Sequence, residues 1–172
     1  MRSGSGDILK TKRIDDSFNN AKGETMKPVW ILVLGRTGAR IFERHGDEQK
    51  VHFVLEVLHP EGRLKEGELV TDRAGREFDT VRKVSHAGGH SGEARTHSDQ
   101  LFLKEVADRL RKLKAEGKFS KLYLVSDPHL LGMLLPHLDH EVVQMIVGTV
   151  KKDLSRMVEA DLFPALSGTL VP

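Results

Sequence analysis

The sequence has no cysteine, and aromatic residues make up only 5% of its 172 positions, with a single tryptophan and a single tyrosine. The absence of cysteine excludes disulfides, a thiolate nucleophile and a cysteine-ligated zinc site. The scarcity of aromatic side chains argues against the stacking platforms that bind single-stranded nucleic acids. A chain without cysteine is compatible with a reducing compartment, and we predict a cytoplasmic protein.

Long hydrophobic runs are also missing. The longest apolar run, Val29–Leu34, is far shorter than the roughly 20 residues that a helix needs to cross a bilayer. It is too short and lies too deep in the chain for a secretory signal. We therefore expect no membrane partner. The net charge of +2 permits contact with nucleic acid without demanding it, and we expect neither a DNA partner nor a cofactor.

The length suits one domain with its own core, which we place at residues 26–172. Residues 1–25 are polar and hold few apolar anchors, so we predict a disordered leader. Met26 directly precedes the first strand pattern and is a candidate start of the native chain.

The first half of the domain has the pattern of strands. The apolar run Val29–Leu34 is followed by turn residues at 35–38 and by an alternating segment, Ala39–Arg44. A third segment, Val51–Leu58, also alternates in part, so we predict a three-stranded antiparallel meander. Residues 59–96 show no sustained period, and we predict a long loop, which in a compact domain is usually functional or disordered.

The second half alternates helices with strands. Apolar residues spaced along one stripe predict a helix over Asp99–Glu116, and Asp127-Pro128 has the pattern of a helix start. The remaining expected elements are a strand at 121–126, a helix at 129–135, a strand at 145–150 and a helix at 155–162. The order predicts an α/β (α+β) fold, in which helices pack on a mixed sheet that starts with the meander.

Two adjacent glycines, Gly88 and Gly89, stand out within the predicted loop. Because they lack Cβ atoms, the backbone there can approach another molecule closely. His86 and His90 bracket them, and the predicted helix follows. A flexible tip on a rigid stem is the usual place for a working site.

This tip resembles that of archaeal and eukaryotic class-1 release factors. Their Gly-Gly-Gln tip is preceded by histidine and followed by serine, a basic residue and a long helix. Here His86 precedes the glycines, Ser91 follows the tip and Arg95 lies a few residues on. The tip departs from the family at its third residue, where His90 replaces glutamine.

Further segments resemble the bacterial host attachment protein family. They are Gly35–Phe42, His59–Arg63, Asp72–Arg76 and Lys152–Leu154. Together the resemblances imply a ribonuclease H-like core, the ribosome or tRNA as partner, and a tip that promotes hydrolysis of the peptidyl-tRNA ester. Gly88, Gly89 and His90 would be the catalytic residues.

Basic and polar residues near the tip and on the following helix are candidates for RNA contact. They are His86, Ser91, Arg95, Arg73, Arg76, Arg111 and Lys114. A solvated outer helix face is the alternative explanation for the last two.

Two other functions remain open. One is a non-enzymatic binding module, in keeping with the host attachment label. The other is a metal-dependent hydrolase built on His86, His90, His97 and Asp99, although their spacing matches no standard metal motif.

Two further motifs do not indicate a catalytic site. The Gly35–Gly38 segment lacks the Gly-Lys-Ser/Thr ending of a phosphate loop. Helix capping by Asp127 explains the Ser126-Asp127 pair without a nucleophilic serine.

Overall fold

The computed structural model describes residues 27–63 and 90–170, with side chains from Arg95 onward in the second range. The strands are β1 (Val29–Gly35), β2 (Gly38–Arg44), β3 (His52–Leu58), β4 (Lys121–Val125) and β5 (Ile146–Val150). The helices are α2 (His90–Ala115), α3 (Pro128–Leu134), α4 (His140–Val143) and α5 (Glu159–Leu166), with short 3₁₀ helices η1 (Pro60–Arg63) and η2 (Leu135–His137). The predicted leader at 1–25 lies outside the described residues.

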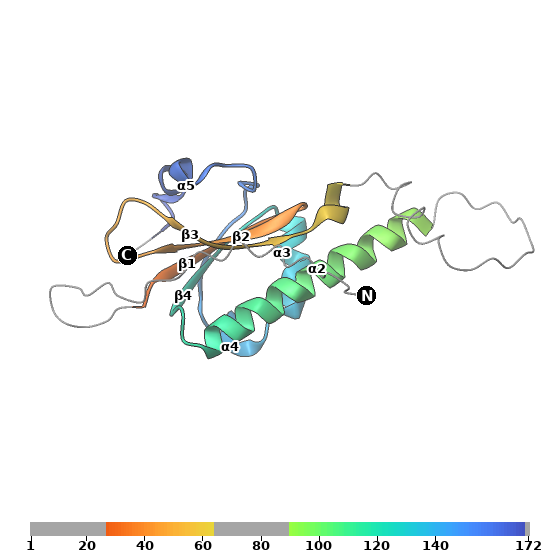
Figure 1. The fold of residues 1–172 in the computed structure, drawn as a ribbon, viewed down its shortest axis with the longest axis horizontal. Coiled ribbons are helices and arrows are strands. Elements are labelled where there is room, and N and C mark those ends of the chain that lie inside the picture. Colours follow the sequence, from red (N-terminus) through yellow and green to blue (C-terminus); the bar gives the residue numbers. More distant parts are fainter. Residues whose placement is uncertain (1–26, 64–89, 171–172) are drawn as a thin grey trace, which may run out of the picture.

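The strands form one mixed sheet in the order β3-β2-β1-β4-β5 (Figure 1). β1, β2 and β3 are the predicted antiparallel meander, whereas β4 and β5 add to it in parallel with β1. The α/β prediction with a mixed sheet is therefore confirmed, and the ribonuclease H-like relation stays a prediction. Because β1, β3, β4 and β5 run in one direction, all four end at one edge of the sheet. We call this the carboxyl edge.

Helices cover both faces of the sheet. Alternate residues of β1 point to opposite faces, so Trp30 and Leu32 join the core under α2, α3 and α4, whereas Ile31 and Val33 join the core under α5. β1 is buried on both faces because it is the central strand, which explains its unbroken apolar run. No helix in the described ranges is long and apolar enough to span a membrane.

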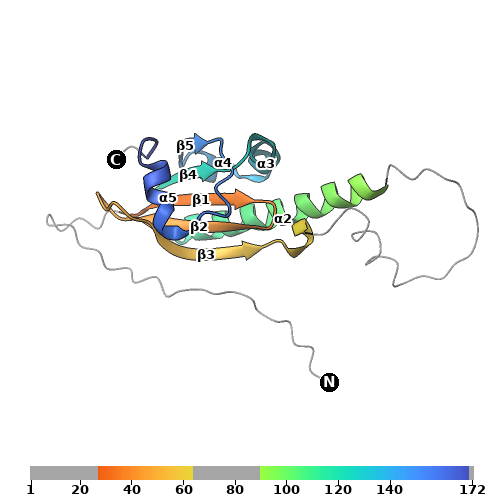
Figure 2. The same ribbon diagram turned by 90° about the horizontal axis from the view of Figure 1, so that it is seen from above.

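The helix α2 begins at His90, nine residues before its predicted start at Asp99. Figures 1 and 2 show its N-terminal part extending beyond the carboxyl edge. Residues 90–97 carry no apolar stripe, and a helix segment that extends beyond the sheet does not need one. The predicted loop over 59–96 is thus too long at both ends, since η1 and the start of α2 lie within it.

The last helix lies four residues later than predicted, at Glu159–Leu166 rather than 155–162. The side chain of Arg40, on β2, donates hydrogen bonds to the carbonyl oxygens of Leu154, Ser155 and Met157. These bonds hold the segment against β2. The segment from 151 to 158 therefore crosses the sheet as an irregular strap before α5 begins (Figure 2).

Candidate functional site at the carboxyl edge

The chain leaves the described fold after η1 and returns to it as α2, both at the carboxyl edge. Gly88 and Gly89 directly precede α2 and lie outside the described residues, as do His86, Arg73 and Arg76. His90 and Ser91 form the first turn of α2 as backbone. The segment 64–89 with the predicted tip is thus attached to the fold between η1 and the start of α2.

A buried histidine joins the two attachment points. Nδ1 of His59 lies 2.8 Å from the carbonyl oxygen of Arg36, and its Nε2 lies 3.0 Å from the hydroxyl of Ser98 on α2. The imidazole also stacks on Phe102 of α2, with ring centroids 4.5 Å apart and planes 3° from parallel. His59 therefore fastens the N-terminal half of α2 to the turn between β1 and β2.

The hydrogen bonds around His59 connect three elements. A carbonyl oxygen only accepts, so Nδ1 donates to Arg36 in the β1–β2 turn. The hydroxyl of Ser98 lies between Nε2 of His59 and the carboxylate of Glu61 on η1, to which it donates. The carboxylate of Asp99 on α2 lies 3.8 Å from Nδ1 of His59. We call His59, Glu61, Ser98 and Asp99 the root cluster.

The root cluster is not built as a nucleophilic site. A catalytic serine gives its proton to histidine, whereas Ser98 donates to Glu61. Ser98 and His59 are only 7% and 5% exposed, so a substrate does not reach them. The arrangement is structural: it ties η1, the β1–β2 turn and α2 together at the base of segment 64–89.

Gly62 brings η1 into direct contact with the same turn. A Cβ atom at this position would lie 1.9 Å from the carbonyl oxygen of Arg36. The backbone N–H of His59 also donates to the carbonyl of Thr37, at 2.9 Å. Only a residue without a side chain allows this close approach.

The strap packs against the other side of the β1–β2 turn. A Cβ on Gly35 would lie 2.3 Å from the Cβ of Ser155, so β1 and the strap touch. The carboxylate of Asp153 accepts hydrogen bonds from the hydroxyl and the backbone N–H of Ser155. These bonds lower the pKa of Asp153 and outweigh the opposing effect of partial burial, and the positive charges of Arg156 and Arg36 make smaller contributions in the same direction as the bonds.

Three segments that are distant in the sequence thus meet at the carboxyl edge. They are Gly35–Phe42, His59–Arg63 and Lys152–Leu154, three of the four segments in which the sequence resembles the host attachment proteins. The fourth, Asp72–Arg76, lies outside the described residues. Residues 30–166 match the family described as "Protein required for attachment to host cells". The chain belongs to this family.

The family match runs from β1 into the end of α5, so it includes the carboxyl edge and segment 64–89. The family description says nothing of translation. No curated protein matches the chain.

The candidate RNA contacts of this family member whose side chains are described, Arg95, Arg111 and Lys114, are spread along α2. Arg111 and Lys114 lie near the C-terminal end of α2, roughly 32 and 36 Å along the helix from His90 at about 1.5 Å per residue. Arg111 pairs with Asp108 at 2.9 Å, and Lys114 pairs with Glu141. Arg95 lies nearer the tip and is half-buried on α2. RNA contact by these residues stays a prediction.

The metal alternative gains no geometry from the described residues, among which no group of three or more histidine or acidic side chains is placed to hold an ion. His97 is exposed, and Asp99 lies 3.8 Å from His59 in the root cluster. The side chains of His86 and His90 lie outside the described part of the chain.

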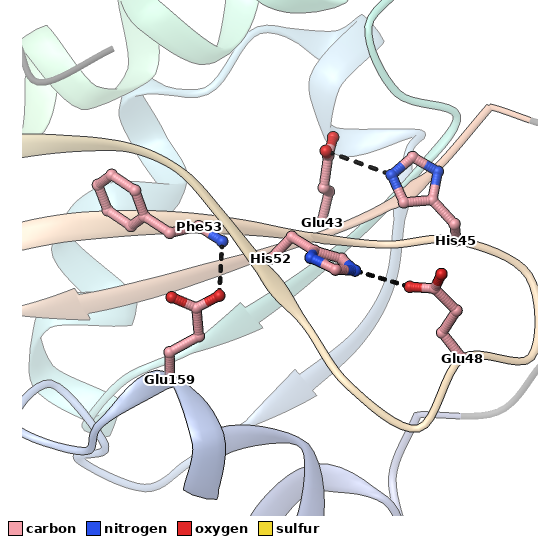
Figure 3. A network of polar contacts seen from close by, with 6 residues as sticks. All are labelled: Glu43, His45, Glu48, His52, Phe53 and Glu159. Atoms are coloured by element: carbon pink, nitrogen blue, oxygen red, sulfur yellow. Dashed lines mark hydrogen bonds and ion pairs between the residues drawn. The ribbon is translucent and has the colours of Figure 1, made fainter. Parts of the chain in front are cut away.

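A second histidine cluster lies at the opposite edge of the sheet (Figure 3). His45 pairs with Glu43 at 3.2 Å, and His52 pairs with Glu48 at 2.8 Å. In the same region Glu159 accepts a hydrogen bond from the backbone N–H of Phe53, which holds the start of α5 against β3. The two pairs link residues in and around the β2–β3 turn, at the edge opposite η1 and the start of α2.

The residues after β4 have the structural role that the sequence indicates. The carboxylate of Asp127 accepts from the backbone N–H groups of His129 and Leu130 and caps α3. Ser126 is fully buried, and its hydroxyl has no hydrogen-bond partner within the described residues. A buried hydroxyl cannot meet a substrate at the surface, so it is not a candidate nucleophile.

Proposed function

We propose that this family member is a ribosome-directed factor that promotes hydrolysis of peptidyl-tRNA through Gly88, Gly89 and His90. The observation that supports the proposal is the attachment of segment 64–89. The long helix α2 begins immediately behind the two glycines, and the root cluster fastens this helix to the sheet. The proposed tip is therefore joined directly to a long helix that is anchored to the sheet.

The chemistry needs little from side chains. Water attacks the ester carbonyl carbon, the bond to the 3′ oxygen of the tRNA breaks, and a proton from the water passes to that oxygen. Backbone N–H groups of the tip can donate to the oxyanion or to the leaving oxygen. This function survives the replacement of glutamine by His90. The side chain would then affect only how the water is positioned.

The test is a release assay on ribosome-bound peptidyl-tRNA. We expect weak release by the native protein, loss of release in Gly89→Ala and faster release in His90→Gln. Gly132→Ala is the matched control, because a Cβ on this exposed glycine of α3 meets no other atom within 4 Å. Equal release by all four proteins, or none by any of them, contradicts the proposed chemistry.

A second candidate is a binding module without chemistry, which the family description favours. One observation supports it: His59 and Ser98 of the root cluster are buried and connect η1 with α2, the two elements between which segment 64–89 is attached. Co-sedimentation with ribosomes without release of peptide would favour this function. If the protein neither co-sediments with ribosomes nor releases peptide, the ribosome is not its partner.

A further inference from the structure

We propose that the carboxyl edge carries a phosphate-contact surface for RNA formed by Arg36, Lys151, Lys152 and Arg156. We call these four residues the basic edge. The inference deepens the proposed function, because it assumes a partner that contains RNA. It adds a surface that lies outside segment 64–89 and outside α2.

The four residues come from two segments that pack together. Arg36 occupies the turn between β1 and β2, and the other three lie on the strap after β5. The contact between Gly35 and Ser155 joins the two segments. Arg36 and Arg156 both act on the charge of Asp153, so both guanidinium groups lie near one carboxylate.

The side chains of the basic edge are exposed and not engaged elsewhere. All four residues are exposed, and none of their side chains forms a hydrogen bond or an ion pair with another described residue. By contrast, Lys114 is paired with Glu141, and Arg40 is bound to carbonyl groups of the strap. The neighbouring carboxylates at this edge are engaged, since Asp153 binds Ser155, Asp127 caps α3 and Glu61 accepts from Ser98, so the four cations are left exposed and unpaired with described residues.

Exposed cations that are not paired with other described side chains suit a phosphodiester backbone. Guanidinium groups bind phosphate oxygens in a bidentate manner, and lysines supply point charges that release counterions from the nucleic acid. The basic edge lies at the same edge of the sheet as η1 and the start of α2, between which segment 64–89 is attached. A phosphodiester backbone bound at the basic edge therefore lies at the edge of the sheet where segment 64–89 is attached.

The experiment measures binding of fluorescently labelled deacylated tRNA by anisotropy over a range of salt concentrations. The test variant is Lys151→Gln/Lys152→Gln. Its matched control is Lys50→Gln/Lys121→Gln, which removes the same charge from two exposed lysines at the opposite edge of the sheet.

Each lost phosphate contact lowers the slope of log K against log salt by about 0.7 to 0.9, which at 0.1 M salt is roughly a five- to eightfold loss of affinity. For the two lysines we expect a loss of roughly 25- to 60-fold, and Arg36→Gln should weaken binding further. The control variant should bind within about twofold of the native protein.

Three results overturn the inference: no tRNA binding by the native protein at low salt, equal losses in the test and control variants, or binding to anionic lipid vesicles that depends on Lys151 and Lys152 while tRNA binding does not. Failure of the proposed function is separate. Patch-dependent tRNA binding without ribosome co-sedimentation supports the basic edge and contradicts the ribosome as partner. Ribosome co-sedimentation that is unchanged in Lys151→Gln/Lys152→Gln supports the ribosome as partner and contradicts the basic edge.

Discussion

Replacing Gly62 with alanine tests whether η1 is fastened to the β1–β2 turn. An ideal Cβ at this position lies 1.9 Å from the carbonyl oxygen of Arg36 and 2.9 Å from Nδ1 of His59. Ordinary van der Waals contact begins at 3.4 Å, so η1 and the turn must move apart by about 1.5 Å. The carbonyl is backbone and cannot rotate away as a side chain would.

That movement breaks the 2.8 Å hydrogen bond between His59 and Arg36. Leaving a buried polar group unpaired costs about 1–3 kcal/mol, and overpacking costs about another 1–3 kcal/mol. We therefore expect the free energy of unfolding to fall by roughly 2–6 kcal/mol, with a decrease in Tm on the order of 10 °C. Ribosome binding should weaken as well, although no residue of segment 64–89 is changed.

Urea unfolding can be followed by the fluorescence of Trp30, the single tryptophan, which is fully buried and stacks on Phe119 with ring centroids 4.8 Å apart. Gly132→Ala is the control, and its stability should stay equal or rise by up to about 1 kcal/mol, because it lies in a helix with open space around it. If Gly62→Ala unfolds at the same urea concentration as the native protein, η1 does not contact the turn as described.

Three further changes test other contacts of the carboxyl edge. Arg40→Ala removes the hydrogen bonds to carbonyl oxygens in segment 154–157 and should lower the free energy of unfolding by about 2–4 kcal/mol in urea; no change would show that these bonds do not hold the strap. Asp153 has a folded-state pKa below its unfolded value of 3.8, so its carboxylate stabilises the fold above that pH, and this contribution is lost as pH falls through the folded pKa. Asp153→Asn should therefore be less stable than the native protein at pH 7 and equally stable in acid below both pKa values, and a stability difference that persists in acid would contradict this. His59→Phe keeps a flat ring on Phe102 but loses both nitrogens, which should cost about 2–4 kcal/mol in thermal unfolding, and an unchanged Tm would show that the hydrogen bonds of the root cluster contribute nothing.

The sequence predicts the elements whose signals are local. The apolar run of β1, the turn residues after it and the alternation of β2 predict the hairpin within one or two residues. Asp127 and Pro128 predict the start of α3, because an N-cap acceptor and proline at the first helical position act on the adjacent backbone alone. These features need no knowledge of the rest of the fold.

The features that position the candidate site are not local. Arg40 reaches carbonyl groups more than 110 positions away, and His59 reaches Ser98 across segment 64–89. Nothing in the spacing of these residues indicates that they meet. The first turns of α2 were missed for a related reason, since the helical period is visible only where a helix buries one face.

The contact between η1 and α2 also makes the stability of the fold largely independent of the length and sequence of segment 64–89. Residues 64–89 join two points that His59 and Ser98 already hold together, and the five described strands come from other parts of the chain. Each doubling in the length of such a connection costs only about 0.6 kcal/mol in closure entropy. Insertions, deletions or a grafted foreign peptide can therefore alter what the protein recognises while its resistance to unfolding hardly changes.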